Sequence, residues 1–188
     1  MDVNERLEYL DREYLSDFDV SDVDIHANIE RQAAFDKPVY ETKPYAITED
    51  ESLEDNTYLS YNAVIGTSVD AKLYLAFQIL DYALVMTPGA PVKQALLDAG
   101  ISTDVYSIVA KNSNSKEQDR FVSVINDTLE KLVKDGINER TIEAGINYYE
   151  FKYREADYGP YPKGLMYYLT MMDSWLYDET KPFIHIEA

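Results

Sequence analysis

The side chains that perform most hydrolytic and metal chemistry in proteins are scarce in this sequence. Cysteine is absent, and the two histidines, His26 and His185, lie 159 residues apart (185 − 26). A catalytic zinc ion needs three protein ligands, commonly two histidines on one helix and a carboxylate. Neither an HExxH nor an HxxEH pattern occurs. The sequence therefore predicts no catalytic residue, no metal ligand and no cofactor site in this chain.

A calcium loop is a second possibility, because Asp17, Asp19, Asp22 and Asp24 lie close together. An EF-hand loop beginning at Asp17 needs glycine at its sixth position and glutamate at its twelfth. Asp22 and Asn28 stand there instead. The alternation of these acids with apolar residues favours an extended segment. Glycine-rich phosphate loops and the GxSxG serine motif do not occur either.

One aromatic and charged cluster stands out at residues 148–164, in a chain with 17 tyrosines. Its candidate functional residues are Arg154, Tyr158, Tyr161 and Lys163. Tyrosines gathered at a corner between two helices can form a rigid surface that contacts peptides. The alternative is structural, with the same residues holding the turn between the helices.

The charge of the chain narrows its partners. Thirty-five acidic residues against 17 basic ones give a net charge of −18, and residues 1–56 alone hold 17 acids and 5 bases, a net of −12. Nucleic acids and anionic membranes both attract basic surfaces, so neither is an expected partner. No run of about 18 apolar residues occurs, which predicts no membrane span. The polar start of the chain resembles no targeting peptide, so we expect a cytoplasmic location.

The spacing of apolar residues predicts the elements that position these side chains. Asp70 is expected to cap a helix that is apolar on nearly every side and therefore central, and Pro91 and Gly100 are expected to bound the next one. Helices are predicted at residues 6–15, 71–86, 91–100, 116–135, 139–158 and 162–177, and strands at 57–66 and 105–111. Two strands are too few for a stable sheet, so residues 20–25 and 39–47 are further strand candidates.

Ordered strings along nearly the whole chain resemble one family. They are YLDREYL at 9–15, YLSYN at 58–62, LDY at 80–82, PGAPVKQALLDAG at 88–100, IVAKN at 108–112, READYG at 154–159, YPKGL at 161–165 and DSWLYD at 173–178. Together they resemble the presequence-protease subgroup of the insulinase/pitrilysin-type zinc metallopeptidases.

This resemblance implies an α+β fold, with an antiparallel sheet and helices packed on one face. Residues 1–15 would be a helix from the end of a preceding domain, 16–56 an acidic extended linker, and 57–188 an incomplete non-catalytic domain. The stretch between Gly100 and Ile108 is shorter than the family pattern, which usually holds an extra strand there. Unpaired strand edges would then favour a homodimer.

The function implied is part of the wall of a peptide-degrading chamber and a docking surface for the catalytic domain. Zinc would be bound elsewhere in a longer parent protein, whose remaining domains and unstructured peptides are the expected partners. Arg154, Tyr158, Tyr161 and Lys163 would contact the chamber or a neighbouring domain. The alternative is a free-standing acidic protein-interaction module without enzymatic activity, because an acidic surface attracts basic partners.

Overall fold

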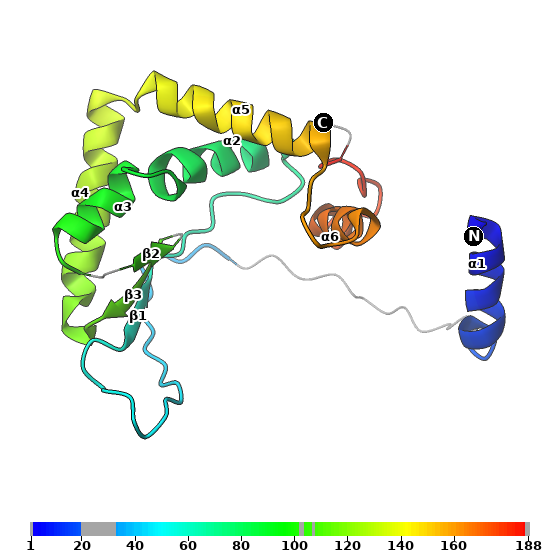
Figure 1. Cartoon of the computed structure of the whole chain (residues 1–188), viewed down its shortest axis with the longest axis horizontal. Coiled ribbons are helices and arrows are strands. Elements are labelled where there is room, and N and C mark those ends of the chain that lie inside the picture. Colours follow the sequence, from blue (N-terminus) through cyan, green and yellow to red (C-terminus); the bar gives the residue numbers. More distant parts are fainter. Residues whose placement is uncertain (1, 20–32, 102–103, 107, 187–188) are drawn as a thin grey trace. The chain divides into compact units, whose positions relative to one another are not determined.

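The computed structural model describes residues 2–19, 33–101, 104–106 and 108–186 (Figure 1). The chain divides into two compact units, Met1–Gln32 and Ala33–Ala188. The expected boundaries after residues 15 and 56 stay predictions.

The described part of the first unit, residues 2–19, contains one helical stretch, α1 (Val3–Leu10) followed by a π-helical turn, η1 (Asp11–Leu15). The Asp2 carboxylate caps it by accepting a hydrogen bond from the Asn4 N–H at 2.7 Å. The helix predicted at 6–15 is thus confirmed and begins three residues earlier. Its apolar side chains are exposed, with Leu7 and Tyr14 at 58%. The strand candidate at 20–25 lies outside the described residues.

In the second unit a small antiparallel sheet has the strand order β1-β3-β2. Its strands are β1 (Thr57–Ser60), β2 (Asp104–Tyr106) and β3 (Val109–Ser113). Leu59 pairs with Ala110 and Thr57 with Ser113, which leaves one extra residue on β3. This is a bulge, and Asn112 there has a φ of 51°, a conformation that asparagine tolerates better than most residues.

The strand predictions were right in part. The strand predicted at 57–66 is present but shorter, as β1 (Thr57–Ser60). The strand predicted at 105–111 is two strands, β2 and β3, because Asp104–Tyr106 pairs antiparallel with Val109–Lys111. The third strand therefore comes from within the stretch between Gly100 and Ile108 and not from the candidate at 39–47, which forms no strand. The Tyr45 ring packs instead against Tyr58 of β1 with ring centroids 5.4 Å apart.

The core lies on one face of this sheet, where helices α3 (Pro91–Asp98) and α4 (Gln118–Asp135) pack. Phe121 and Ile125 of α4 meet Val92 and Leu96 of α3 there, and all four are at most 2% exposed. The expected ends of α3 are confirmed, with Pro91 at its first position and Gly100 at a φ of 65°. Gly136 ends α4 at a φ of 85°. The predicted α+β class is confirmed.

Helix α2 (Ala71–Asp81) begins as predicted, with the Asp70 carboxylate accepting from the Leu73 N–H at 3.0 Å, and continues as the π-helical turn η2 (Tyr82–Met86). Its predicted central position is wrong for the described residues. None of its side chains is fully buried, and Phe77 is 37% exposed. The buried positions lie in η2 instead, at Ala83 and Val85.

One stretch of the described residues, Ala71–Asp98, is long and apolar enough to cross a membrane by length and composition alone. Such a window tolerates a few polar residues, so the stretch qualifies although it holds no uninterrupted run of about 18 apolar residues. The stretch is weak support for a span, because core helices of soluble proteins pass the same test. It is also broken at Thr87, whose backbone is extended, and Val92 and Leu96 after the break belong to the core.

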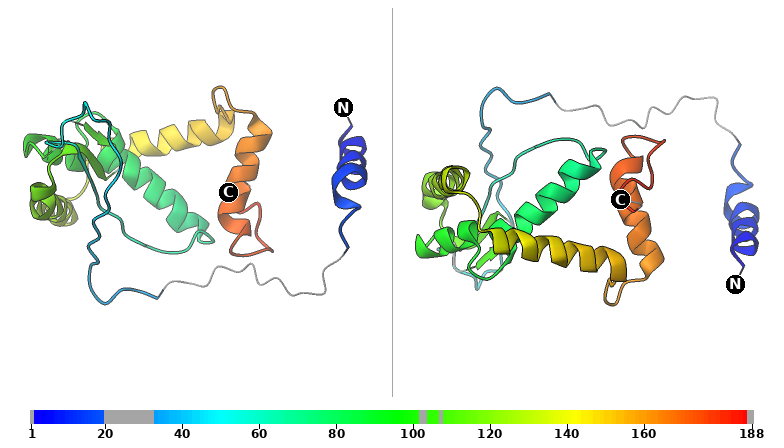
Figure 2. Two further views of the ribbon diagram at one scale, coloured as in Figure 1. Left: turned by 90° about the horizontal axis from the view of Figure 1, so that it is seen from below. Right: turned by 90° about the horizontal axis from the view of Figure 1, so that it is seen from above.

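Helix α5 (Glu139–Glu155) crosses α2 closely near Gly145, and Figure 2 shows the two helices diverging from that crossing. A Cβ added at Gly145 would lie 3.2 Å from Ile79 Cγ2 and 3.3 Å from Tyr82 Cδ1, so the small residue allows the approach. Helix α6 (Lys163–Trp175) follows. Both helices end before the predicted residues, α5 because Ala156 adopts a left-handed conformation.

Candidate functional site

The four residues predicted from the 148–164 cluster all lie at the corner between α5 and α6. Arg154, in the last turn of α5, forms an ion pair with Glu150 at 2.6 Å, and its side chain is 76% exposed. The Lys163 ammonium donates to the Glu155 carbonyl at 3.2 Å, across the corner. Lys163 therefore satisfies a free carbonyl at the end of α5, which is a structural contribution.

The two tyrosines of the corner behave differently. The Tyr158 ring stands edge-on to Tyr167 of α6 with centroids 5.8 Å apart, and burial followed by the neighbouring Tyr167 raises its pKa. Tyr161 is 61% exposed. The structure thus gathers the four residues at one corner but does not aim them at a common cavity. Their role in contacting peptide or another domain stays a prediction.

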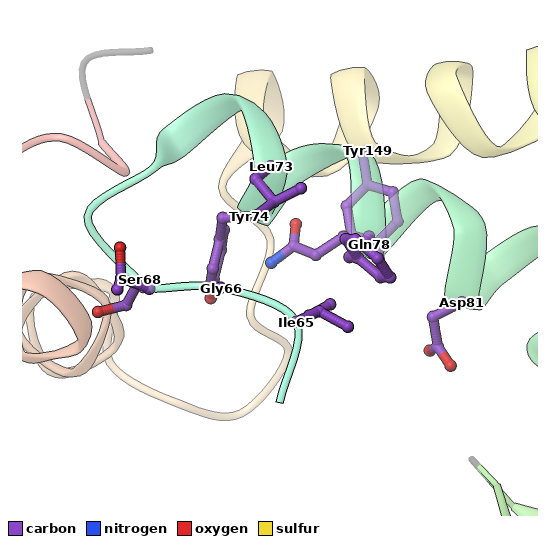
Figure 3. Close-up of a pocket in the computed structure, with 10 residues that line it drawn as sticks. Ile65, Gly66, Ser68, Leu73, Tyr74, Gln78, Asp81 and Tyr149 are labelled. Atoms are coloured by element: carbon purple, nitrogen blue, oxygen red, sulfur yellow. The ribbon is translucent and has the colours of Figure 1, made fainter. Parts of the chain in front are cut away.

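A cleft of about 420 Å³ lies elsewhere, between α2 and the loop that precedes it. Tyr149 reaches it from α5, and Figure 3 shows Ser68 at one end and Asp81 at the other. The walls are mainly apolar. The residues that line it are Ile65, Gly66, Thr67, Ser68, Leu73, Tyr74, Phe77, Gln78, Asp81 and Tyr149.

Asp81 is the anionic group of the cleft. Its carboxylate is partly buried and has no hydrogen-bond or ion-pair partner among the residues that the structure describes, and burial raises its pKa. Tyr149 lies close enough to sense this charge, because its pKa is raised to about 12 first by burial and then by Asp81. An unpaired carboxylate in an apolar setting is unfavourable and is stabilised by a cation.

The opposite end of the cleft is formed by the loop at 65–68. The Ser68 hydroxyl oxygen is buried there and has no hydrogen-bond partner in the described part of the chain. Gly66 permits a close approach of loop and helix, since a Cβ at this position would lie 2.4 Å from Leu73 Cδ2. The loop therefore leaves one polar group without a partner beside an apolar wall.

Tyrosine rings tie α5 to α2 and η2 behind the cleft. Tyr82 stacks on Tyr148 with centroids 4.7 Å apart, and Tyr148 meets Tyr149 edge-on at 5.1 Å. The Tyr153 hydroxyl donates to the Gln78 side-chain oxygen at 2.9 Å. Aromatic pairs of this kind add about 0.5–1.5 kcal/mol each beyond the area that they bury. They position Tyr149 in the cleft.

Tyr74 joins α2 to α6 and to His185, through one hydrogen bond and one ring contact. The Tyr74 hydroxyl donates to the Asp173 carboxylate of α6 at 3.2 Å, and burial with that charge raises the Tyr74 pKa to about 12. Its ring lies 4.2 Å from the ring of His185, which is buried and whose Nε2 has no hydrogen-bond partner among the described residues.

The described residues do not fit the zinc ion that the family resemblance implies. No three of their His, Asp or Glu side chains come together in a way that could hold a metal ion. His185 faces a tyrosine ring, and His26 lies outside the described residues. The cleft instead suits binding of a side chain that is apolar along its length and positively charged at its end.

Sequence reasoning missed this cleft. The available signal is Asp81, the one acidic residue in the apolar stretch at 71–86. Its importance depends on Tyr149 and on the loop at 65–68, which are brought to it only by the packing of α5 and by the turn before α2.

No family model matches the chain. The chain is 40% identical over 198 residues to "Protein HypA" of Clostridium perfringens, covering 99% of this chain and 20% of that protein. It is 29% identical over 180 residues to "Presequence protease 1, chloroplastic/mitochondrial" of Arabidopsis thaliana, covering 88% of this chain and 17% of that protein.

The chain thus spans about a fifth of the length of these curated relatives. The similarity to the presequence protease supports the insulinase-type peptidase superfamily, which was the resemblance drawn from the sequence.

Proposed function

We propose that this chain acts as a non-catalytic segment of a zinc-dependent insulinase-type oligopeptidase, as part of the wall of its peptide chamber. The observation that carries the proposal is the similarity over 88% of the chain to a region that makes up 17% of a presequence protease. The described residues hold no metal-ligand group, so the zinc would be bound by another part of the parent.

Exposed apolar side chains support a docking role. Helices α5 and α6, the corner between them and the turn after α6 leave large apolar residues open to solvent, at 44–64% exposure: Phe151, Tyr161, Leu165, Tyr168, Trp175, Leu176 and Tyr177. Covering the exposed half of one such side chain contributes roughly 0.7–1.5 kcal/mol, half of the value for full burial. A neighbouring domain of the parent would cover this surface, which we call the α5–α6 apolar surface.

A chimera tests the proposal. The matching region of the Arabidopsis presequence protease is replaced by this chain, and hydrolysis of an unstructured peptide is measured with and without a zinc chelator. We expect a folded chimera that cleaves the peptide and loses activity with the chelator. A folded chimera without hydrolysis would contradict the proposal.

A second experiment measures peptide hydrolysis by the isolated chain. With added zinc it should not cleave the same peptide, because the described residues provide no ligand set for the ion. Zinc-dependent turnover by the pure chain would refute a non-catalytic role. The relative itself serves as the positive control for peptide and buffer.

A further inference from the structure

We propose that the cleft between the loop at 65–68 and α2 binds a basic side chain, arginine or lysine, of an extended peptide. This rests on the proposed function, which brings peptides to this domain, and adds the class of side chain that the surface selects. The juxtaposition that carries it is a carboxylate, unpaired among the described residues, at one end of a mainly apolar and aromatic cleft.

The carboxylate is the first step of the argument. Asp81 is partly buried, and its lack of a partner among the described residues leaves a negative charge in a poorly solvated place. Such a charge favours a cation over a neutral group, and the attraction is stronger than at an open surface because less water screens it. A guanidinium or an ammonium group meets this requirement.

The walls are the second step. Arginine and lysine carry three or four methylene groups before the charge, and these stems pack along apolar surface. Leu73 and Phe77 supply such surface on α2, and Ile65 supplies it from the loop. A volume of about 420 Å³ falls within the usual range of ligand sites, so one long side chain fits with room for water.

The aromatic ring of Tyr149 is the third step. Cations within about 6 Å of a tyrosine ring are attracted by its π-electrons. Lys152, which does not line the cleft, already makes such a contact with this ring, because its Nζ lies 5.6 Å from the ring centroid. Lys152 forms no ion pair with Asp81, so that carboxylate is left for an incoming cation.

The test compares two peptides that differ in charge alone. Both are short, unstructured, capped at each end and fluorescently labelled; one has a single arginine and the other has citrulline there, which keeps the shape and removes the charge. Binding to the 188-residue chain is followed by fluorescence anisotropy at about 0.15 M salt. We expect the arginine peptide to bind about tenfold more tightly, the ratio that corresponds to 1.4 kcal/mol.

Two variants separate the cleft from general attraction to an acidic protein. Asp81→Asn removes the charge of the cleft, and Asp127→Asn removes one charge from the exposed surface of α4. Asp81→Asn should abolish the tenfold preference, and Asp127→Asn should leave it within a factor of two. Equal effects of the two variants, or equal binding of the two peptides, would overturn the proposal.

A third variant acts through shape. In Gly66→Ala the new methyl group would meet Leu73 Cδ2 at 2.4 Å, so the Leu73 side chain must move within the cleft. We expect weaker binding of the arginine peptide at unchanged net charge, and unchanged binding would count against the cleft. Circular dichroism establishes that each variant is folded.

The two proposals fail separately. Arginine binding that depends on Asp81, together with an inactive chimera, would leave the cleft standing and remove the chamber role. An active chimera with no effect of Asp81→Asn on peptide binding would do the opposite.

Discussion

Replacing a leucine by alanine at two positions tests where the isolated chain has a core and where it leaves a surface to be covered. Leu96 of α3 is 0% exposed and packs in the core, whereas Leu165 of α6 is 48% exposed. The two substitutions remove the same atoms from a helix. Their different cost therefore reports burial alone.

The expected magnitudes follow from these exposures. The transfer contribution of the atoms lost from a fully buried leucine is about 2.4 kcal/mol at 0.8 per carbon, and the cavity raises the total to about 2.7–5 kcal/mol. Leu165 is already about half exposed, so Leu165→Ala loses only about half of that transfer contribution, roughly 1.2 kcal/mol, and leaves no cavity. We therefore expect Leu96→Ala to lower the free energy of unfolding by at least about 1.5 kcal/mol more than Leu165→Ala.

Thermal unfolding followed by circular dichroism measures the difference. For a chain of this size each kcal/mol shifts the Tm by about 2–4 °C, so the two variants should differ by at least about 3–6 °C. Equal Tm values would refute the assignment of the core.

In the presequence-protease chimera the difference in Tm between the two variants should narrow, because docking of a neighbouring domain would bury Leu165. An unchanged gap there would contradict the proposed docking of the α5–α6 apolar surface.

Three further predictions concern charge, backbone and assembly. Asp81→Asn should raise the Tm at pH 7, because burial raises the folded-state pKa of Asp81 above its ordinary value of 3.8 and the charged form therefore disfavours folding. The gain in Tm should fade as the pH drops through the folded-state pKa, and a gain that persists well below pH 3.8 would contradict this. Gly159→Ala should lower the free energy of unfolding by about 1 kcal/mol because φ is +58° there. Gly164→Ala should raise it by up to about 1 kcal/mol, because the residue lies in α6 with open space around a new Cβ. Urea unfolding measures both changes, and changes of the same sign would refute the reasoning. We propose that the edges of β1 and β2 allow a homodimer, so sedimentation at high concentration should show one, and a clean monomer would oppose it.

Features set by neighbouring residues were predictable from the sequence. The start of α2 at Asp70, Pro91 at the start of α3, and the positive φ of Gly100 and Gly136 depend on hydrogen bonds and sterics within a few residues. The family strings also pointed to the superfamily that the presequence-protease similarity supports. The absence of a zinc motif needed no structure, because it is a property of residue types and spacing.

Tertiary packing decided the rest. The separation of β2 from β3 depends on cross-strand pairing between them. The apolar pattern of the sequence is the same for two short paired strands as for one longer strand, so it could not predict the pairing. The burial of Leu96 and the exposure of Phe77 depend on which helices meet, and both sit in apolar stretches that look alike in sequence. The cleft has the same origin: Asp81 and Tyr149 are far apart along the chain, and only the close crossing of α2 and α5 at Gly145 brings the ring beside the carboxylate.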